Sequence, residues 1–289
     1  MRIEFLGTGG AIGLPRPTCD CRVCSEARAR GVPYARFGPA VFVHGPDLLI
    51  DTPEDIVPAL NRANIRRVGA VVWSHWHPDH TAGMRLFELL NVTLDWPPSF
   101  TRTPVYLPRG VHEDFAQFHS LWERVEYYER MGVLAPHVLA DDEPFTLNGV
   151  TVEPYRLPDP SVQAYAYILT EGAARVLIAP DELFGWVPDP ALGHFNLVVM
   201  QTGLFDVHPL TGERLIPAEH PVLQREATFE QTLEMARALD ADRILLTHLY
   251  AHEVGSYDDL MKVQRKISEE DPALGRRVMF AFDRLAVMP

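Results

Sequence analysis

The sequence predicts an α/β fold in which mixed β-sheets pack face to face with helices outside. Short apolar runs that are typical of buried strands alternate with amphipathic helical segments, and hairpins interrupt this alternation. The 289 residues, 47% of them hydrophobic, are enough to bury a large core. Because no internal repeat or low-complexity linker divides the chain, we expect one compact domain over residues 1–289.

The first half of the chain is predicted to contain strands and helices in alternation. Gly45-Pro46 marks a hairpin between two apolar runs, and an apolar run at 68–73 predicts a buried strand. The expected strands are 2–6, 40–44, 47–51, 68–73 and 104–107, and the expected helices are 53–64 and 81–91. Aromatic residues at helical spacing over 110–128 favour a helix face in the core, with a lid or a homodimer contact as the alternative.

The second half is predicted to begin with two hairpins. They turn at Asn148-Gly149 and at Glu171-Gly172, which are suitable turn dipeptides. Further strands are expected at 195–201 and 243–246, and further helices at 228–239 and 256–267. A last hairpin is expected to join 278–282 to 285–288 around Asp283-Arg284.

A glycine-rich turn, residues 7–13, follows the first strand. A dinucleotide-binding fingerprint would need glycine where Ile12 stands, and no helix pattern follows at once. We therefore expect these glycines to let the backbone pass close to a functional site.

The charge of the chain argues against some partners. With 26 basic and 39 acidic residues, the net charge is -13, which disfavours extended contact with nucleic acid or an anionic membrane but allows a local basic pocket. No secretory signal precedes the first strand, and no apolar run approaches the roughly 18 residues of a membrane span. We expect a cytoplasmic protein.

The most informative stretch is Ser74-His75-Trp76-His77-Pro78-Asp79-His80, directly after the strand at 68–73. Imidazole and carboxylate together suit zinc and similar divalent ions. On a strand end, His75 and His77 can point the same way, whereas Asp79 and His80 in the following turn can face a second point. Two adjacent metal ions are therefore possible. The alternative is that Asp79 or Thr81 merely caps the helix at 81–91. A cap needs one oxygen atom and would not explain the histidines.

Three cysteines, Cys19, Cys21 and Cys24, lie within six positions, and the chain has no other. Their number and spacing make a disulfide framework implausible, and they provide three corners of a tetrahedral zinc site that would be closed and structural. His252 is our candidate for the fourth ligand. The alternative is three free, buried thiols.

The histidine-rich stretch resembles the signature of the metallo-β-lactamase superfamily of hydrolases. The Gly-Thr-Gly-Gly start and the cysteine knuckle resemble the branch that contains the phosphoribosyl 1,2-cyclic phosphate phosphodiesterases and the pyrroloquinoline quinone biosynthesis protein B family. The resemblance covers nearly the whole chain and implies a four-layer αββα sandwich.

The resemblance also implies roles for residues at distant strand ends. Asp51 would orient a ligand histidine from behind the site, and Asp181 would bridge two metal ions. His248 would be the last ligand of metal 2. The implied set for metal 1 is His75, His77 and Asp181, and that for metal 2 is Asp79, His80, Asp181 and His248.

One corner of metal 1 departs from the family pattern. Members usually place a third histidine in the loop before the strand at 164–170, but residues 156–161 contain none. Asp159 is the suitable ligand there, and a carboxylate would shift the preference toward harder ions such as manganese. The alternative is a corner open to water.

The expected function is hydrolysis of a small, possibly cyclic, phosphodiester by a hydroxide that bridges two divalent ions, zinc or manganese, with one further structural zinc. Asp79 is an expected catalytic residue, and His208 would protonate the leaving oxygen. His220 is the competing candidate for this proton donor. Alternatively, both histidines are surface residues without a catalytic role. The alternatives are a tRNA 3′ processing endonuclease, a lactone or thioester hydrolase, and a metal-binding protein without turnover. The endonuclease would need a basic RNA-binding arm that this acidic chain lacks.

Overall fold

Two β-sheets form the centre of the molecule in the computed structural model, which describes residues 1–96, 100–141, 143–250 and 255–289. The first sheet has the order β14-β1-β2-β3-β4-β5-β6, and the second has the order β13-β12-β11-β10-β9-β8-β7. The strands of the first sheet are β1 (Arg2–Gly7), β2 (Ala40–His44), β3 (Leu48–Ile50), β4 (Ala70–Val72), β5 (Thr103–Pro108), β6 (Leu134–Leu139) and β14 (Ala286–Val287). Those of the second are β7 (Phe145–Leu147), β8 (Val150–Arg156), β9 (Tyr165–Glu171), β10 (Ala174–Ala179), β11 (Phe195–Gln201), β12 (Ala241–Thr247) and β13 (Val278–Phe280).

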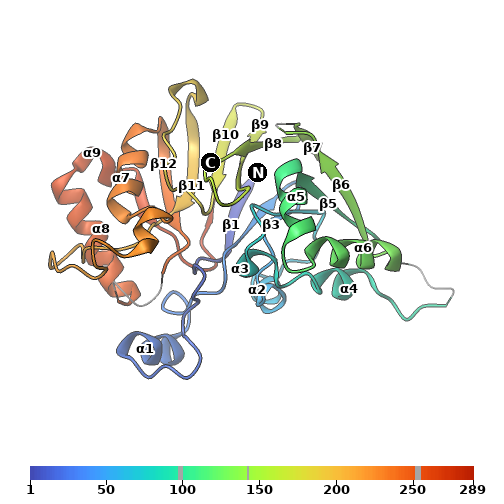
Figure 1. Cartoon of the computed structure of the whole chain (residues 1–289), viewed down its shortest axis with the longest axis horizontal. Helices are drawn as coiled ribbons and strands as arrows, with labels where there is room; N and C mark the ends of the chain where they lie inside the picture. Colours follow the sequence, from blue (N-terminus) through green and yellow to red (C-terminus); the bar gives the residue numbers. More distant parts are fainter. Residues whose placement is uncertain (97–99, 142, 251–254) are drawn as a thin grey trace.

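Helices cover the outer faces of both sheets (Figure 1). The helices are α1 (Arg22–Arg30), α2 (Ile56–Arg62), α3 (Pro78–Thr81), α4 (Leu86–Asn91), α5 (Arg109–Gln117), α6 (Leu121–Met131), α7 (Phe229–Ala238), α8 (Tyr257–Glu270) and α9 (Pro272–Gly275), with 3-10 turns at η1 (Pro190–Leu192) and η2 (Pro221–Gln224). Helices α2, α4, α5 and α6 pack on the first sheet, and α7, α8 and α9 pack on the second.

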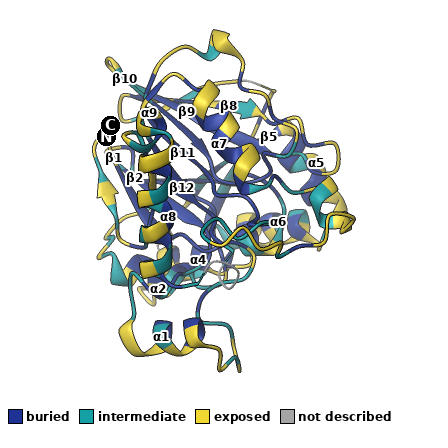
Figure 2. Cartoon of the chain, turned by 90° about the vertical axis from the view of Figure 1, so that its left-hand side faces the viewer, coloured by how far each residue is buried: buried dark blue, intermediate teal, exposed yellow. Residues whose placement is uncertain are grey.

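The core between the sheets explains why the strands read as continuous apolar runs. Val43 and Ile50 of the first sheet share one buried cluster with Tyr167, Ile178 and Val199 of the second. Alternate residues of the same strands face the outer helices, so both faces of the central strands are buried. Figure 2 shows the buried interior in dark blue, and α1 projecting from the body of the molecule. This arrangement confirms the predicted four-layer αββα fold.

Parallel pairing gathers several strand ends at one edge of the sandwich. Strand β3 is parallel to β4 in the first sheet, and β10, β11 and β12 are parallel in the second. The carboxyl ends of parallel strands meet at a common edge, and the loops that follow them can build a site there. Four predicted site residues follow such ends: Asp51, His75, Asp181 and His248.

Most local predictions are confirmed, including the hairpins that turn at Asn148-Gly149 and at Gly172, where these residues adopt positive φ. The prediction of a last hairpin between 278–282 and 285–288 is wrong. Strand β13 pairs with β12, whereas β14 pairs with β1 in the other sheet. The helical stretch at 110–128 is divided into α5 and α6, and β6 is an additional strand.

Within the described ranges, no helix has the length and apolar character needed to cross a membrane.

Candidate metal centre

The histidine-rich stretch leaves the end of β4 in a fixed direction. The indole of Trp73 donates to the Thr52 hydroxyl at 2.8 Å, and the Tyr167 hydroxyl donates to the Trp73 carbonyl at 2.7 Å. The first hydrogen bond ties β4 to its neighbour and the second ties it to the opposite sheet. The backbone that carries His75 is thus held from two sides.

The first group of converging side chains consists of His75, His77, Asp181 and Glu182. Each offers one ligand atom, and these atoms all lie within 4.8 Å of one another. His75 Nε2 lies 2.9 Å from His77 Nδ1, which lies 3.0 Å from Glu182 Oε1. Neighbouring strand ends of the two sheets, β4 and β10, supply this group.

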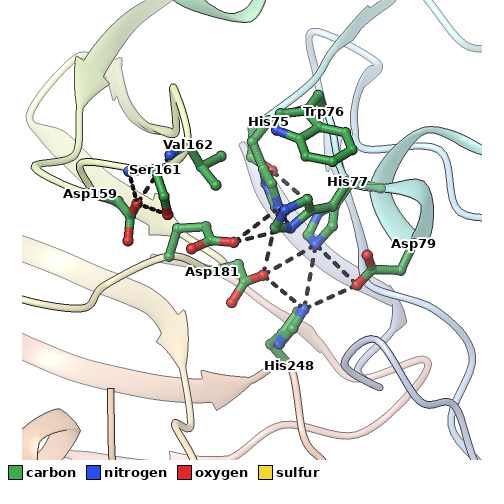
Figure 3. A network of polar contacts seen from close by, with 12 residues as sticks. His75, Trp76, His77, Asp79, Asp159, Ser161, Val162, Asp181 and His248 are labelled. Carbon is green, nitrogen blue, oxygen red and sulfur yellow. Dashed lines mark hydrogen bonds and ion pairs between the residues drawn. The ribbon is translucent and has the colours of Figure 1, made fainter. Parts of the chain in front are cut away.

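The second group consists of Asp79, His80 and His248, whose ligand atoms likewise lie within 4.8 Å. Asp181 Oδ2 stands between the groups, 3.2 Å from His248 Nε2, 3.5 Å from His80 Nε2 and 3.7 Å from His75 Nε2. Figure 3 shows this carboxylate between His75 and His248. The position suits one carboxylate shared by two cations.

Asp51 and Ser74 fix the orientation of two of the imidazoles. Asp51 Oδ2 lies 2.8 Å from His80 Nδ1 and accepts the Ser74 hydroxyl at 2.8 Å. The Ser74 oxygen in turn lies 3.0 Å from His75 Nδ1. If Nδ1 carries the proton in both rings, the Nε2 lone pairs of His75 and His80 point toward the cluster, as metal ligation requires. These contacts of Asp51 are the ones that its predicted supporting role requires.

Buried charges shift the acidities of the cluster. Burial lowers the pKa of His75, and the neighbouring His80 and His77 lower it further. Burial opposes ionisation of Asp79, but the charges of His80 and His248 outweigh it and lower its pKa. For His80, burial is likewise outweighed, because Asp79 and Asp51 raise its pKa. The protein therefore favours ionised Asp79 and Asp181, whereas burial raises the pKa of Glu182.

The donor set fits divalent cations. Asp181 Oδ1 and His248 Nδ1 are buried without a hydrogen-bond partner among the described residues. His80 Nε2 and His248 Nε2 face each other at 3.4 Å, an arrangement that leaves lone pairs directed at a common point. Asp79, Asp181 and Glu182 carry three formal negative charges beside four imidazoles. Two dications would carry four positive charges, enough to neutralise the three carboxylates and leave one positive charge for a bound hydroxide or substrate anion.

The backbone adopts an uncommon conformation at three of these positions. Asp51, Glu182 and His248 have φ values of 67°, 59° and 53°, in the left-handed region that few residues other than glycine adopt. Such conformations persist where the surrounding structure enforces them, and they cluster at functional sites. Gly10 contributes by close approach, since a Cβ there would lie 3.0 Å from His248 Nδ1.

Asp159 is not brought into either group. Its Oδ1 accepts hydrogen bonds from the backbone and hydroxyl of Ser161, both at 2.7 Å, and from the Val162 amide at 3.0 Å. Figure 3 shows the carboxylate turned toward these residues. Glu182 instead fills the corner of the first group where the sequence favours Asp159.

The two histidines considered as proton donors occupy loops after β11. His208 Nδ1 accepts from the amides of Leu210 at 3.1 Å and Thr211 at 3.4 Å, so it supports its own turn. His220 caps η2, where its Nδ1 accepts the Val222 amide at 3.2 Å. Neither belongs to the two groups of converging atoms.

The three cysteines gather as predicted. Ligand atoms of Cys19, Cys21 and Cys24 lie within 4.8 Å of one another. Cys21 is the N-cap of α1, and the Cys24 amide that donates to its sulfur is the main cause that lowers the pKa of its thiol to about 7, which favours the thiolate that zinc requires. The predicted fourth ligand, His252, lies outside the described residues.

Three residues near the two groups of ligand atoms, here called the metal groups, were not predicted from the sequence. Glu182 directly follows Asp181, and only its left-handed backbone turns it toward His77. Burial, followed by the charges of Asp181 and Glu182, raises the pKa of Glu226 to about 9. The ring of Tyr250 lies 5.6 Å from that of His248. Of the three, only Tyr250 has a signal in the sequence, because it lies two residues after the predicted ligand His248.

Known proteins match this chain both in sequence and in structure. A curated relative, the octanoyltransferase of Porphyromonas gingivalis, is 27% identical over 174 residues, which are 60% of this chain but 34% of that protein. The match thus spans about a third of the length of that relative. A diphosphatase from the PhnP family superposes with a TM-score of 0.70 at 21% identity, covering 100% of this chain and 97% of that one. Zinc-bound PqqB from Methylobacterium extorquens superposes with a TM-score of 0.71 at 15% identity, covering 100% of both chains.

A family match identifies the chain more directly than these structural likenesses, which at such identities show the fold alone. Residues 45–249 match the β-lactamase superfamily domain. That range includes both groups of converging ligand atoms and extends over more than half of the sequence. The chain therefore belongs to the metallo-β-lactamase superfamily.

Proposed function

We propose that this protein is a metal-dependent hydrolase that cleaves a small phosphodiester. The observation that carries the proposal is the position of Asp181 Oδ2 between two groups of ligand atoms, one with His75 and the other with His248. Two divalent ions would supply Lewis acidity and an acidified water there at neutral pH, which is the chemistry that phosphodiester hydrolysis needs.

Each of the two proposed ions would be held by its own set of side chains, with one carboxylate in common. His75, His77 and Glu182 would hold one ion, and Asp79, His80 and His248 the other, with Asp181 shared. Asp51 and Ser74 would keep His75 and His80 in the ligating tautomer. Asp79 would thus act through the second ion, in agreement with the role predicted for it.

Glu182 affects the choice of metal. A first group with two imidazoles and two carboxylates is harder than one with three imidazoles. We propose that manganese or a similar hard ion competes with zinc at this position. A third ion, structural zinc, would be held by Cys19, Cys21 and Cys24, with His252 as the proposed fourth ligand.

Metal analysis combined with hydrolysis tests the proposal. Protein reconstituted separately with zinc and with manganese is assayed on bis(4-nitrophenyl) phosphate, and bound metals are counted by mass spectrometry. About three tightly bound ions per chain together with turnover would support a dinuclear phosphodiesterase. One zinc per chain without turnover would support a metal-binding protein. Turnover of lactones or thioesters alone would move the chain to that class of hydrolase.

A further inference from the structure

An apolar cavity adjoins the metal groups. It has a volume of about 450 Å³ and is lined by Ile12, Leu204, Leu215, Ile216, Pro217, His220, Val222 and Tyr250. None of these described lining residues carries a formal charge when His220 is neutral. A cavity of this size and lining suits an organic group rather than an ion.

Two walls of the cavity connect it to the metal groups. Tyr250 lines it and places its ring 5.6 Å from the ring of His248. Ile12 stands on the glycine turn that passes His248 at Gly10, whose amide donates to the Leu249 carbonyl at 3.1 Å. A substrate whose reacting phosphorus lies beside His248 can therefore extend into the cavity.

Two of the lining residues carry groups that can donate hydrogen bonds. His220 Nδ1 accepts the Val222 amide, so in the neutral ring the proton resides on Nε2, which can donate. The Tyr250 hydroxyl is the second donor. Apolar walls with two such groups favour a ring or short chain that carries oxygen acceptors, and the described lining residues include no arginine or lysine to hold a second phosphate or a carboxylate.

We propose that this cavity binds the non-reacting organic group of the substrate, and that this group is uncharged and largely apolar with one or two oxygen acceptors. The inference rests on the proposed phosphodiesterase function and narrows it. Substrates that carry a second phosphate on the organic group would be disfavoured.

Three diesters that all release 4-nitrophenolate test the proposal: methyl, phenyl and 4-carboxyphenyl 4-nitrophenyl phosphate. The methyl ester leaves the cavity empty and serves as the internal control. We expect kcat/KM for the phenyl ester to exceed that for the methyl ester by about 10-fold or more, and the 4-carboxyphenyl ester to lose most of this gain. Equal values for the methyl and phenyl esters, or a preference for the carboxyphenyl ester, would overturn the proposal.

A matched pair of variants locates the effect. Leu215→Arg places a charge in the cavity, whereas Leu210→Arg places it on the same loop, at another partly buried leucine outside the lining. We expect Leu215→Arg to bring the phenyl-to-methyl ratio close to one and Leu210→Arg to leave it unchanged. Using the ratio removes any general attraction of the new charge for anionic diesters. An unchanged ratio in Leu215→Arg would refute the assignment.

A binding measurement separates this proposal from the proposed function. If the wild-type protein hydrolyses none of the diesters, the phosphodiesterase proposal fails, but the cavity is still testable with the neutral probe 4-nitrobenzyl alcohol. Saturation-transfer NMR should then detect the probe on wild type and Leu210→Arg and lose it on Leu215→Arg. No transfer to the probe on the wild-type protein would overturn the cavity assignment.

Discussion

Asp51 Oδ2 lies 2.8 Å from Nδ1 of His80, and both side chains are buried. The pair connects the end of β3 to the metal groups, because His80 Nε2 faces Asp181 and His248. A carboxylate behind a ligating histidine fixes its ring and raises its basicity. If His80 binds a metal ion as proposed, its affinity for that ion depends on Asp51, which belongs to neither group of ligand atoms.

Asp51→Asn should therefore weaken metal binding without unfolding the protein. We expect a loss of affinity of about 10–100-fold for the ion held by His80, measured by competition with a chromogenic chelator. Asp114→Asn is the control, since this buried carboxylate accepts the Gln163 amide at 3.0 Å and makes no hydrogen bond with any histidine that the structure describes. Equal losses in both variants would show that Asp51 acts only through general stability.

Glu182→Gln and Asp159→Asn distinguish the two candidates for the corner of the first group. Because Glu182 Oε1 lies 3.0 Å from His77 Nδ1, Glu182→Gln should lose one of the two active-site ions. Asp159→Asn should retain both, since its Oδ1 serves a turn at Ser161 and Val162 and an amide oxygen can accept the same bonds. Metal counting on dialysed protein gives the answer, and the reverse pattern would return Asp159 to the site.

The sequence predicts those parts of the centre that depend on adjacent residues and strand ends. His75, His77, Asp79 and His80 follow from one short stretch, because a strand end and the turn after it direct their side chains. Asp181 and His248 follow from apolar runs only together with the superfamily resemblance. Glu182 was not predicted, because the expected alternation of side chains assumes an extended backbone. Its φ of 59° departs from that conformation and turns its side chain to the same side as Asp181.

The final hairpin shows a different reason for failure. Asp283-Arg284 has the composition of a tight turn, but Asp283 is fully buried and works as an anchor. It accepts hydrogen bonds from the Thr8 amide and hydroxyl, and its other oxygen accepts the Phe37 amide and the Arg62 guanidinium. These long-range contacts carry the chain from one sheet to the other, and no local pattern records them.

Cys21→Ser should reduce thermal stability more than it alters hydrolysis. Removing one thiolate opens the three-cysteine site, and structural zinc contributes directly to folding. We expect one zinc fewer per chain and a lower Tm, with kcat/KM for diesters nearly unchanged. Ser25→Ala is the matched control, because the Ser25 hydroxyl bonds the Asp20 carbonyl in the same turn. An unchanged Tm in Cys21→Ser would reject the structural role.

Glu226→Gln tests whether a protonated carboxyl assists the leaving group. Burial is the main cause that raises the pKa of Glu226 above its usual range, and Glu226 follows Val222 of the cavity wall by one turn. We expect the variant to slow diesters with alkyl leaving groups by about 100-fold and to spare 4-nitrophenyl esters, whose leaving group needs no proton. Equal effects on both ester classes would exclude proton donation, and exposed Glu219→Gln should affect neither.

Asp259 makes the attachment of α1 to α8 sensitive to pH. Its Oδ2 accepts from Arg22 Nη2 at 2.6 Å and from the Ser256 amide at 3.1 Å, and its Oδ1 accepts from Lys262 at 2.7 Å. Burial opposes ionisation, but these donors lower the pKa of Asp259 to about 2. Because the folded pKa lies below the unfolded one, the resulting stabilisation is complete above about pH 4 and is lost as the pH falls toward 2.

The free energies of unfolding of the wild type and Asp259→Asn should thus differ by about 1 kcal/mol at pH 6, after allowing for solvent screening of a partly exposed group. Urea denaturation of the two proteins side by side at each pH lets any loss of metal at low pH affect both equally. The difference should shrink between pH 4 and pH 2, since protonated Asp259 and asparagine are both neutral. Glu270→Gln, which removes a more exposed pair with Lys266 on the same helix, should show a smaller difference throughout. A difference that grows as the pH falls would contradict the assigned direction of the pKa shift.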